Sequence, residues 1–167
     1  MFKGIYRQWR KMVVLLLAVL LMCCTACGID DYSDEHKPFI SVYNEVKSKY
    51  SNIQLARKYM YGYGEYDILY TPTNDKENCF EQMILVLYEF DYVINSEPEF
   101  TNLLNGCYIR VEAFSGEWLA IHYRYDIGTE IRTNSDEDVV PTIKSFFPDT
   151  KVTVCKMVNG KPEQIEF

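Results

Sequence analysis

Apolar and polar positions along the chain change period several times, from the spacing of a helix to the alternation of strands. In residues 38–51, large apolar side chains recur at helical spacing behind Pro38, which suits a first helical turn. Two strand-like runs follow, residues 52–61 and 65–72, on either side of Gly62 and Gly64. The first block therefore predicts a helix and then a hairpin.

The second block carries two competing periods. Residues 80–94 place five apolar side chains on one helical face, whereas the same stretch also alternates as a strand would, from Ile84 to Ile94. Its length favours the helix, and Asn74 with Glu77 has the spacing of a capping box. A short helical turn at residues 98–106 and a hairpin at residues 107–114 and 118–126, turning at Ser115-Gly116, complete the block.

The third block repeats the order. Ser135 with Asp138 resembles a capping box, although Pro141 inside the run is an alternative helix start. Asn159-Gly160 joins residues 151–158 to the last run as a strong hairpin signal. Helix–strand–strand, three times, predicts an α+β fold: a largely antiparallel sheet of about six strands with three helices on one face.

The first thirty residues have a different order of charged and apolar positions. Four basic residues and no acidic one precede an apolar run from Met12 to Met22. That run is shorter than the roughly 20 residues that span a bilayer. A basic segment, a short apolar segment and then small residues are typical of a secretory signal. Residues 1–26 are therefore predicted to be a signal peptide, and a transmembrane anchor is the disfavoured alternative.

The end of this segment, "CTACG" at residues 24–28, resembles the lipobox of bacterial lipoproteins. In that family an apolar residue and two small residues precede an obligatory cysteine, which receives a diacylglyceryl group and becomes the mature N-terminus. The resemblance covers residues 1–28 only and implies lipidation at Cys27. Cys24 stands where a larger aliphatic residue is usual, and Cys24 itself, with Leu21 before it, is the alternative acceptor.

A diacylglyceryl group supplies two acyl chains, which is what stable membrane anchoring requires. The resemblance thus implies a protein tethered on the outer side of a cytoplasmic membrane or in a periplasm. Residues 27–37 are polar and acidic and are predicted to be a flexible tether. Residues 38–167 are predicted to form a single domain, a length sufficient for a core.

Charge and cysteine content narrow the function classes. All 24 acidic residues lie beyond Cys27 with 13 of the 17 basic ones, so the mature chain carries a net charge of about −11. Such a surface repels nucleic acid, which we exclude as a partner. The three cysteines beyond Cys27 allow one disulfide plus a thiol or three thiols; we favour three thiols because the chain is not cysteine-dense. They are Cys79, Cys107 and Cys155.

A candidate binding surface comes from the central hairpin. If its aliphatic residues face the helices, the opposite face carries aromatic side chains beside arginines, the residue types that binding surfaces use. The alternative is ordinary cross-strand pairing on a half-exposed sheet. A tyrosine-lined loop around Gly62 and Gly64 is a weaker candidate. The binding candidates of the hairpin are Tyr108, Arg110, Trp118, His122 and Arg124.

Catalytic and metal signals are sparse. Cys79 near a predicted helix start, where a thiol pKa is lowered, and the strand residue His122 are the residue types that papain-type cysteine peptidases pair. The glycines of those families are missing around Cys79. Neither a metal site nor a cofactor is predicted. We expect a membrane-anchored, non-catalytic binding or accessory module for an envelope protein or glycan; the alternatives are a cell-wall hydrolase and a structural subunit of an envelope complex.

Overall fold

The computed structural model describes residues 36–59, 64–72, 79–124, 126 and 128–167. The compact unit runs from His36 to Phe167. Signal peptide, lipobox and most of the tether lie outside the described residues and stay predictions. The described α-helices are α2 (Lys37–Lys49), α3 (Cys79–Ser96) and α4 (Val140–Phe146), with 3-10 segments η3 (Pro98–Leu104) and η4 (Glu137–Val139). None of the described helices has both the length and the apolar composition needed to cross a bilayer.

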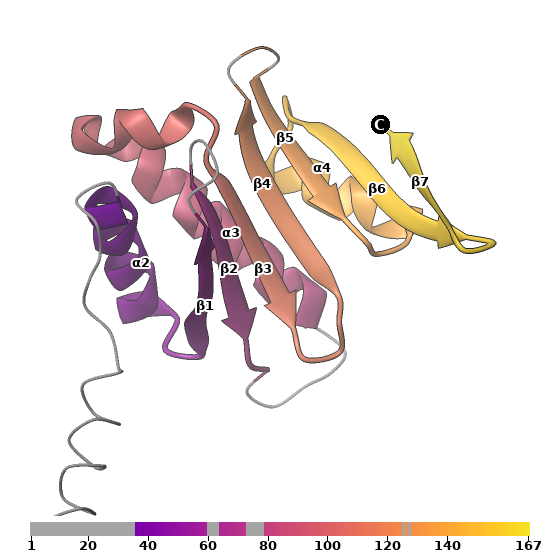
Figure 1. Cartoon of the computed structure of the whole chain (residues 1–167), viewed down its shortest axis with the longest axis horizontal. Coiled ribbons are helices and arrows are strands. Elements are labelled where there is room, and N and C mark those ends of the chain that lie inside the picture. The colour runs from indigo at the N-terminus through magenta and orange to yellow at the C-terminus, as the bar shows by residue number, and fades with distance from the viewer. Residues whose placement is uncertain (1–35, 60–63, 73–78, 125, 127) are drawn as a thin grey trace, which may run out of the picture. The chain divides into compact units, whose positions relative to one another are not determined.

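The strands form one mixed sheet in chain order, from β1 at one edge to β7 at the other (Figure 1). Four neighbouring pairs are antiparallel, whereas β2–β3 and β5–β6 are parallel. The two parallel pairs are those with α3 or α4 between their strands, because a parallel neighbour needs a long crossover. The strands are β1 (Ile53–Tyr59), β2 (Glu65–Tyr70), β3 (Tyr108–Ala113), β4 (Trp118–Arg124), β5 (Gly128–Thr133), β6 (Lys151–Val158) and β7 (Lys161–Glu166).

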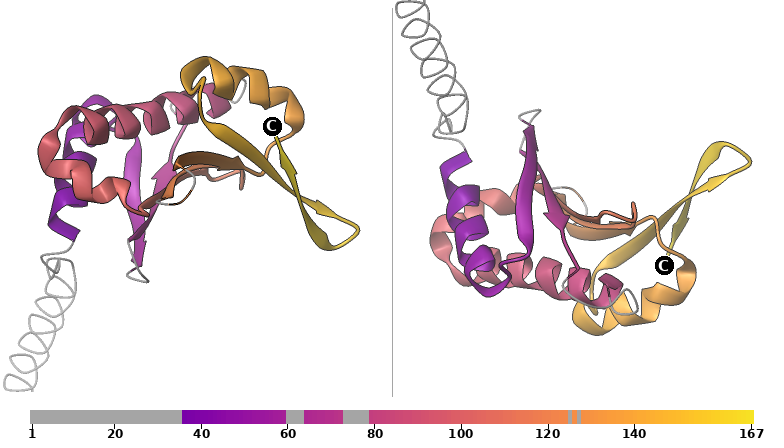
Figure 2. Two further views of the ribbon diagram at one scale, coloured as in Figure 1. Left: turned by 90° about the horizontal axis from the view of Figure 1, so that it is seen from above. Right: turned by 90° about the horizontal axis from the view of Figure 1, so that it is seen from below.

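The α-helices lie on one face of this sheet, as the two end-on views show (Figure 2). The core fills the space between the layers, with α3 at its centre. Burial alternates along β3, where Ile109 and Val111 are buried, and β4 contributes Leu119 and Ile121 from the same face. The aliphatic residues of the central hairpin therefore face the helices, as the sequence analysis assumed.

The conflict of periods over residues 80–94 is resolved in favour of the helix. A strand would put Tyr88 and Tyr92 on the same face as Ile84 and Phe90. Instead Ile84 and Phe90 are fully buried, while Tyr88 and Tyr92 are 40% and 57% exposed. Strand alternation cannot separate these residues, whereas a helix whose buried side runs from Ile84 to Phe90 can, and packing on two strands and α2 stabilises this helix.

The general α+β class is confirmed, but the expected counts are wrong. The described residues hold seven strands and five helical segments, rather than about six and three. The additional strand is β5, with the sequence GTEIRT, in which Ile131 is the only large apolar side chain. So polar a run gives no alternating apolar signal. The threefold helix–strand–strand order fails here, since three strands follow η3.

Local signals at the third block were partly correct. The capping box of Ser135 with Asp138 is wrong: no side chain caps η4 or α4, and α4 starts at Val140 with a proline in its first turn. The Asn159-Gly160 hairpin is confirmed. Both residues have positive φ, 52° and 75°, as the tight turn between strands of right-handed twist requires. Asn74 and Glu77 lie outside the described residues.

Candidate functional site

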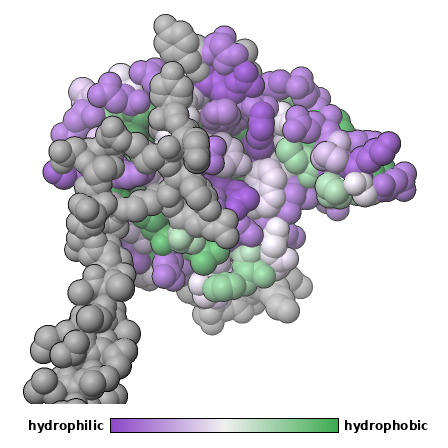
Figure 3. All heavy atoms as spheres, in the orientation of Figure 1, coloured by the Kyte–Doolittle hydropathy of each residue, from purple (hydrophilic) through white to green (hydrophobic). Residues whose placement is uncertain are grey.

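The sheet face turned away from the helices brings the five binding candidates together. On β3 and β4 the candidates alternate with core residues, and the register pairs Tyr108 with His122 and Arg110 with Ala120. We call this surface the outer face; β5 extends it with Glu130 and Arg132. In the space-filling view it is largely hydrophilic, with smaller apolar patches among the charged residues (Figure 3).

Both candidate arginines are already engaged in ion pairs. Arg110 donates from Nε and Nη2 to the two carboxylate oxygens of Asp67, at 3.0 and 3.2 Å, and Nη2 also lies 3.1 Å from Glu112. Arg124 forms the same two-pronged contact with Asp126. The guanidinium group of Arg110 is therefore held in a fixed orientation, which the sequence alone did not indicate, whereas the pair of Arg124 with Asp126 is largely exposed to solvent.

A buried carboxylate on β5 is the main polar group that sequence reasoning missed. Glu130 is only 2% exposed, yet it accepts hydrogen bonds from the Thr153 hydroxyl at 2.7 Å and from Arg132 Nε at 3.1 Å. Burial alone would raise its pKa, but these two donors outweigh it and the Glu130 pKa lies below the usual value. Glu130 and Arg132 thus form an ion pair on the outer face, and the neutral Thr153 hydroxyl completes the cluster by donating to Glu130.

His122 and Tyr108 are neutral neighbours of this cluster. Their rings meet edge to face, with centroids 5.6 Å apart. Burial, followed by the positive charges of Arg132 and Arg124, lowers the His122 pKa, and burial raises the pKa of Tyr108 to about 12. His122 Nδ1 is buried without a hydrogen-bond partner among the described residues. The imidazole is therefore uncharged at neutral pH.

Trp118 stands at the start of β4, opposite Glu112, and is partly exposed. Its position is fixed through the backbone: its N–H donates to Asn134 Oδ1 at 2.7 Å, and its carbonyl accepts from the Thr133 hydroxyl at 2.8 Å. The indole is thus presented by a rigid strand rather than by a loop.

Cys79 lies on the opposite side of the sheet from His122. It is 7% exposed within the core formed by the helices and the inner sheet face. The expectation that the helix start lowers its pKa is wrong: burial, and then the Glu117 carboxylate, raises the Cys79 pKa. The arrangement therefore brings no histidine of the outer face to this thiol.

The sequence also led to predictions about the other cysteines, a metal site and a tyrosine-lined loop. Within the described ranges Cys79, Cys107 and Cys155 are free thiols, and no group of histidine, cysteine and carboxylate residues there could hold a metal ion. Of the five tyrosines around Gly62 and Gly64, at positions 59, 61, 63, 66 and 70, Tyr66 and Tyr70 are core residues. Tyr61 and Tyr63, like the side chain of Tyr59, lie outside what the structure describes.

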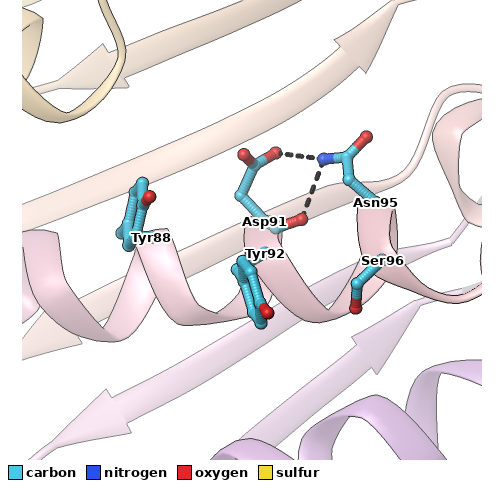
Figure 4. Close-up of a pocket in the computed structure, with 5 residues that line it drawn as sticks. All are labelled: Tyr88, Asp91, Tyr92, Asn95 and Ser96. Atoms are coloured by element: carbon cyan, nitrogen blue, oxygen red, sulfur yellow. Dashed lines mark hydrogen bonds between the residues drawn. The ribbon is translucent and has the colours of Figure 1, made fainter.

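A second feature, on the helix layer, was not found from the sequence. Five residues on the outward side of α3 line a hollow of about 300 Å³: Tyr88, Asp91, Tyr92, Asn95 and Ser96 (Figure 4). These residues are spaced at one and two helical turns, which is the sequence signal for a shared surface on a helix. The alternating strand pattern over the same residues obscures that signal. Burial raises the Asp91 pKa despite hydrogen bonds from Tyr123 and Asn95.

Comparison of the chain with models of protein families, with curated proteins and with solved structures finds no match to any of them.

Proposed function

We propose that this protein is a lipoprotein facing outside the cytoplasm, anchored by lipid on Cys27, whose domain binds an envelope protein or glycan without catalysing a reaction. The observation that carries the binding proposal is the outer face: Trp118 and Tyr108 are partly exposed there, and the orientations of Arg110 and Arg132 are fixed by Asp67 and Glu130. Aromatic and arginine side chains contribute most of the binding energy at protein interfaces.

Rigidity of the outer face supports this proposal. Long arginine side chains ordinarily lose conformational entropy when they bind, at about 0.5–1.5 kcal/mol for each immobilised side chain. On the outer face Arg110 is held by Asp67 and Arg132 by Glu130 before any ligand arrives. Ala120, between them in register, is fully buried, which fits coverage by the arginine stems. The surface is thus preorganised for recognition.

The positions of Cys79 and His122 favour binding over the alternative of a cysteine hydrolase. Nucleophilic catalysis needs a thiol within hydrogen-bond reach of its base, and a depressed thiol pKa. Cys79 is in the core with a raised pKa, whereas His122 is on the outer face with a lowered one. Both shifts oppose the thiolate–imidazolium pair that such a reaction uses.

The anchor is tested by metabolic labelling with a fatty-acid probe. Cys27→Ala should abolish labelling, because the cysteine sulfur is the acyl acceptor, and Cys24→Ala should leave labelling intact. The opposite result, labelled Cys27→Ala and unlabelled Cys24→Ala protein, would assign the lipid to Cys24.

The binding face is tested by truncating its partly exposed tryptophan. Trp118→Ala should remove envelope partners captured by crosslinking of the full-length protein, since interface aromatics contribute about 2 kcal/mol or more. Phe114→Ala is the matched control, because Phe114 is 74% exposed and lies beyond the end of β3. Denaturant midpoints are measured for both variants. If the Trp118 variant loses stability but keeps the same partners, Trp118 stabilises the fold and does not bind a partner.

A further inference from the structure

The hollow on α3 differs chemically from the outer face. Its five lining residues include two exposed tyrosine rings and one carboxylate, and none of the five is basic. Asp91 Oδ1 accepts hydrogen bonds from the Tyr123 hydroxyl and from Asn95 Nδ2, each at 2.9 Å. In the part of the chain that the structure describes, Asp91 Oδ2 has no hydrogen-bond partner, so it is available to a ligand.

The remaining polar atoms of the hollow are mainly acceptors. Asn95 Nδ2 is used twice on Asp91, at the carbonyl and the carboxylate, which leaves the amide oxygen of Asn95 available. Ser96 donates its hydroxyl hydrogen to the Val93 carbonyl at 3.1 Å and keeps its own lone pairs. The carboxylate of Asp91 and the amide oxygen of Asn95 lie on the same side of α3 (Figure 4), and together they require a ligand that donates hydrogen bonds.

The aromatic walls favour a positively charged donor. Tyrosine faces attract ammonium and guanidinium groups within about 6 Å of the ring centroid. The ring of Tyr92 already has one such neighbour, the Lys49 ammonium at 6.0 Å, and the charge of Lys49 is balanced by Glu89. On the other side, the ring of Tyr88 is supported edge to face by Phe146 and Phe147, each centroid at 5.8 Å.

We infer that this hollow binds the cationic end of a lysine or arginine side chain of a partner protein. The guanidinium or ammonium group would meet Asp91 Oδ2 and the Asn95 amide oxygen, with its aliphatic stem against Tyr88 and Tyr92. A volume of about 300 Å³ is at the lower end of the range for small-molecule pockets, so one side chain suits it better than a larger cofactor. The net charge of the mature chain, about −11, attracts basic partners.

Titration calorimetry of the full-length protein in a neutral detergent tests this assignment. The probe is a capped alanine peptide with two arginines, and the same peptide with two glutamates is its counterpart. Asp91→Asn keeps an acceptor for Tyr123 and removes the charge. It should weaken binding of the arginine peptide about tenfold, the usual scale for a desolvated ionic hydrogen bond. Tyr92→Ala should weaken binding severalfold, and denaturant midpoints verify that both variants fold.

The matched control is Glu81→Gln, which removes the same charge from the exposed first turn of the same helix. It should change affinity less than about twofold, because a distant exposed charge is screened. Equal losses from Asp91→Asn and Glu81→Gln would overturn the site in favour of general charge attraction. Binding of the glutamate peptide, or no binding of the arginine peptide, would overturn it as well. Spermidine, if bound more tightly than the peptide, would overturn the assignment to a protein side chain.

Discussion

Two carboxylates on opposite sides of the sheet have pKa values shifted in opposite directions. Glu130, on the outer face, is almost completely buried and yet has a lowered pKa, because Thr153 and Arg132 donate to it. Asp91, beside the hollow on α3, has a raised pKa, because burial outweighs hydrogen bonds from the neutral groups of Tyr123 and Asn95. Burial acts on both; the presence of a cationic partner decides the direction.

The difference suggests two uses of polar side chains in one small domain. On the outer face each arginine is paired within the fold, so a ligand meets a rigid surface whose charges are balanced. The hollow keeps a carboxylate whose ionised form is poorly compensated, so an incoming cation would stabilise it. The paired charges of the outer face stabilise the domain, whereas the uncompensated charge of the hollow is available for binding.

The largest effect is expected where the two regions share one core. Ile121 is fully buried on β4, between the outer face and α3. Ile121→Ala should lower the free energy of unfolding by about 2–5 kcal/mol, because it leaves a cavity in a close-packed interior. Chemical denaturation measures the loss. A change below about 0.5 kcal/mol, the range of surface substitutions, would mean that the two faces have been assigned the wrong way round.

A smaller loss is expected at the centre of the outer face. Glu130→Gln removes the charge that Arg132 and the Thr153 hydroxyl both face. Stability should fall by about 1.5–3 kcal/mol, the range for hydrogen bonds to charged groups. Denaturant midpoints at neutral pH measure it, with Arg132→Gln as a companion variant. Full stability of the Glu130→Gln protein would contradict the claim that this carboxylate is held by its partners.

The opposite pKa shifts predict opposite pH dependence. Glu130 has a lowered pKa in the fold, so the stability it contributes is present above about pH 4.3, the usual glutamate value, and is lost as the pH falls through its folded pKa. Asp91 has a raised pKa, so its contribution is most favourable below about pH 3.9 and is lost as the pH rises through its folded pKa.

This sign difference is measured with the variants themselves. At neutral pH Asp91→Asn should be neutral or slightly stabilising, within about 1 kcal/mol, since it removes a poorly compensated charge and keeps an acceptor. Relative to wild type, the Glu130→Gln protein should regain stability as the medium is acidified. The Asp91→Asn protein should lose its stability advantage over wild type as the pH falls. Parallel pH profiles for the two variants would refute the comparison.

The smallest effect is expected at the rim of the outer face. Arg124 pairs with Asp126 where both side chains are substantially exposed. Arg124→Gln should leave the denaturant midpoint unchanged within error, because exposed ion pairs are screened by solvent and salt. A clear loss of stability, surviving in high salt, would mean that the 4.0 Å contact of Arg124 Nη1 with the buried Glu130 carboxylate outweighs the exposed pair with Asp126.

Periodicity along the chain determines much of this architecture without any tertiary contact. The helix at 37–49, both outer hairpins and the central hairpin follow local apolar spacing and turn residues such as Asn159-Gly160, which act within a few positions. The shared face of Tyr108, Arg110, Trp118, His122 and Arg124 follows from the same two-residue repeat. The lipobox resemblance is also a local pattern, confined to residues 1–28.

Tertiary structure decided what local patterns could not encode. Strand β5 exists because β4 and β6 flank it, so polar Glu130 and Arg132 are satisfied by neighbours rather than by apolar alternation. The residue types of Cys79 and His122 allow a catalytic pair, but the two side chains lie on opposite faces of the sheet. The hollow likewise depends on Tyr123, 32 positions from Asp91, donating across the layers. Burial and pKa are set by such distant partners, and a linear pattern of residue types carries no information on them.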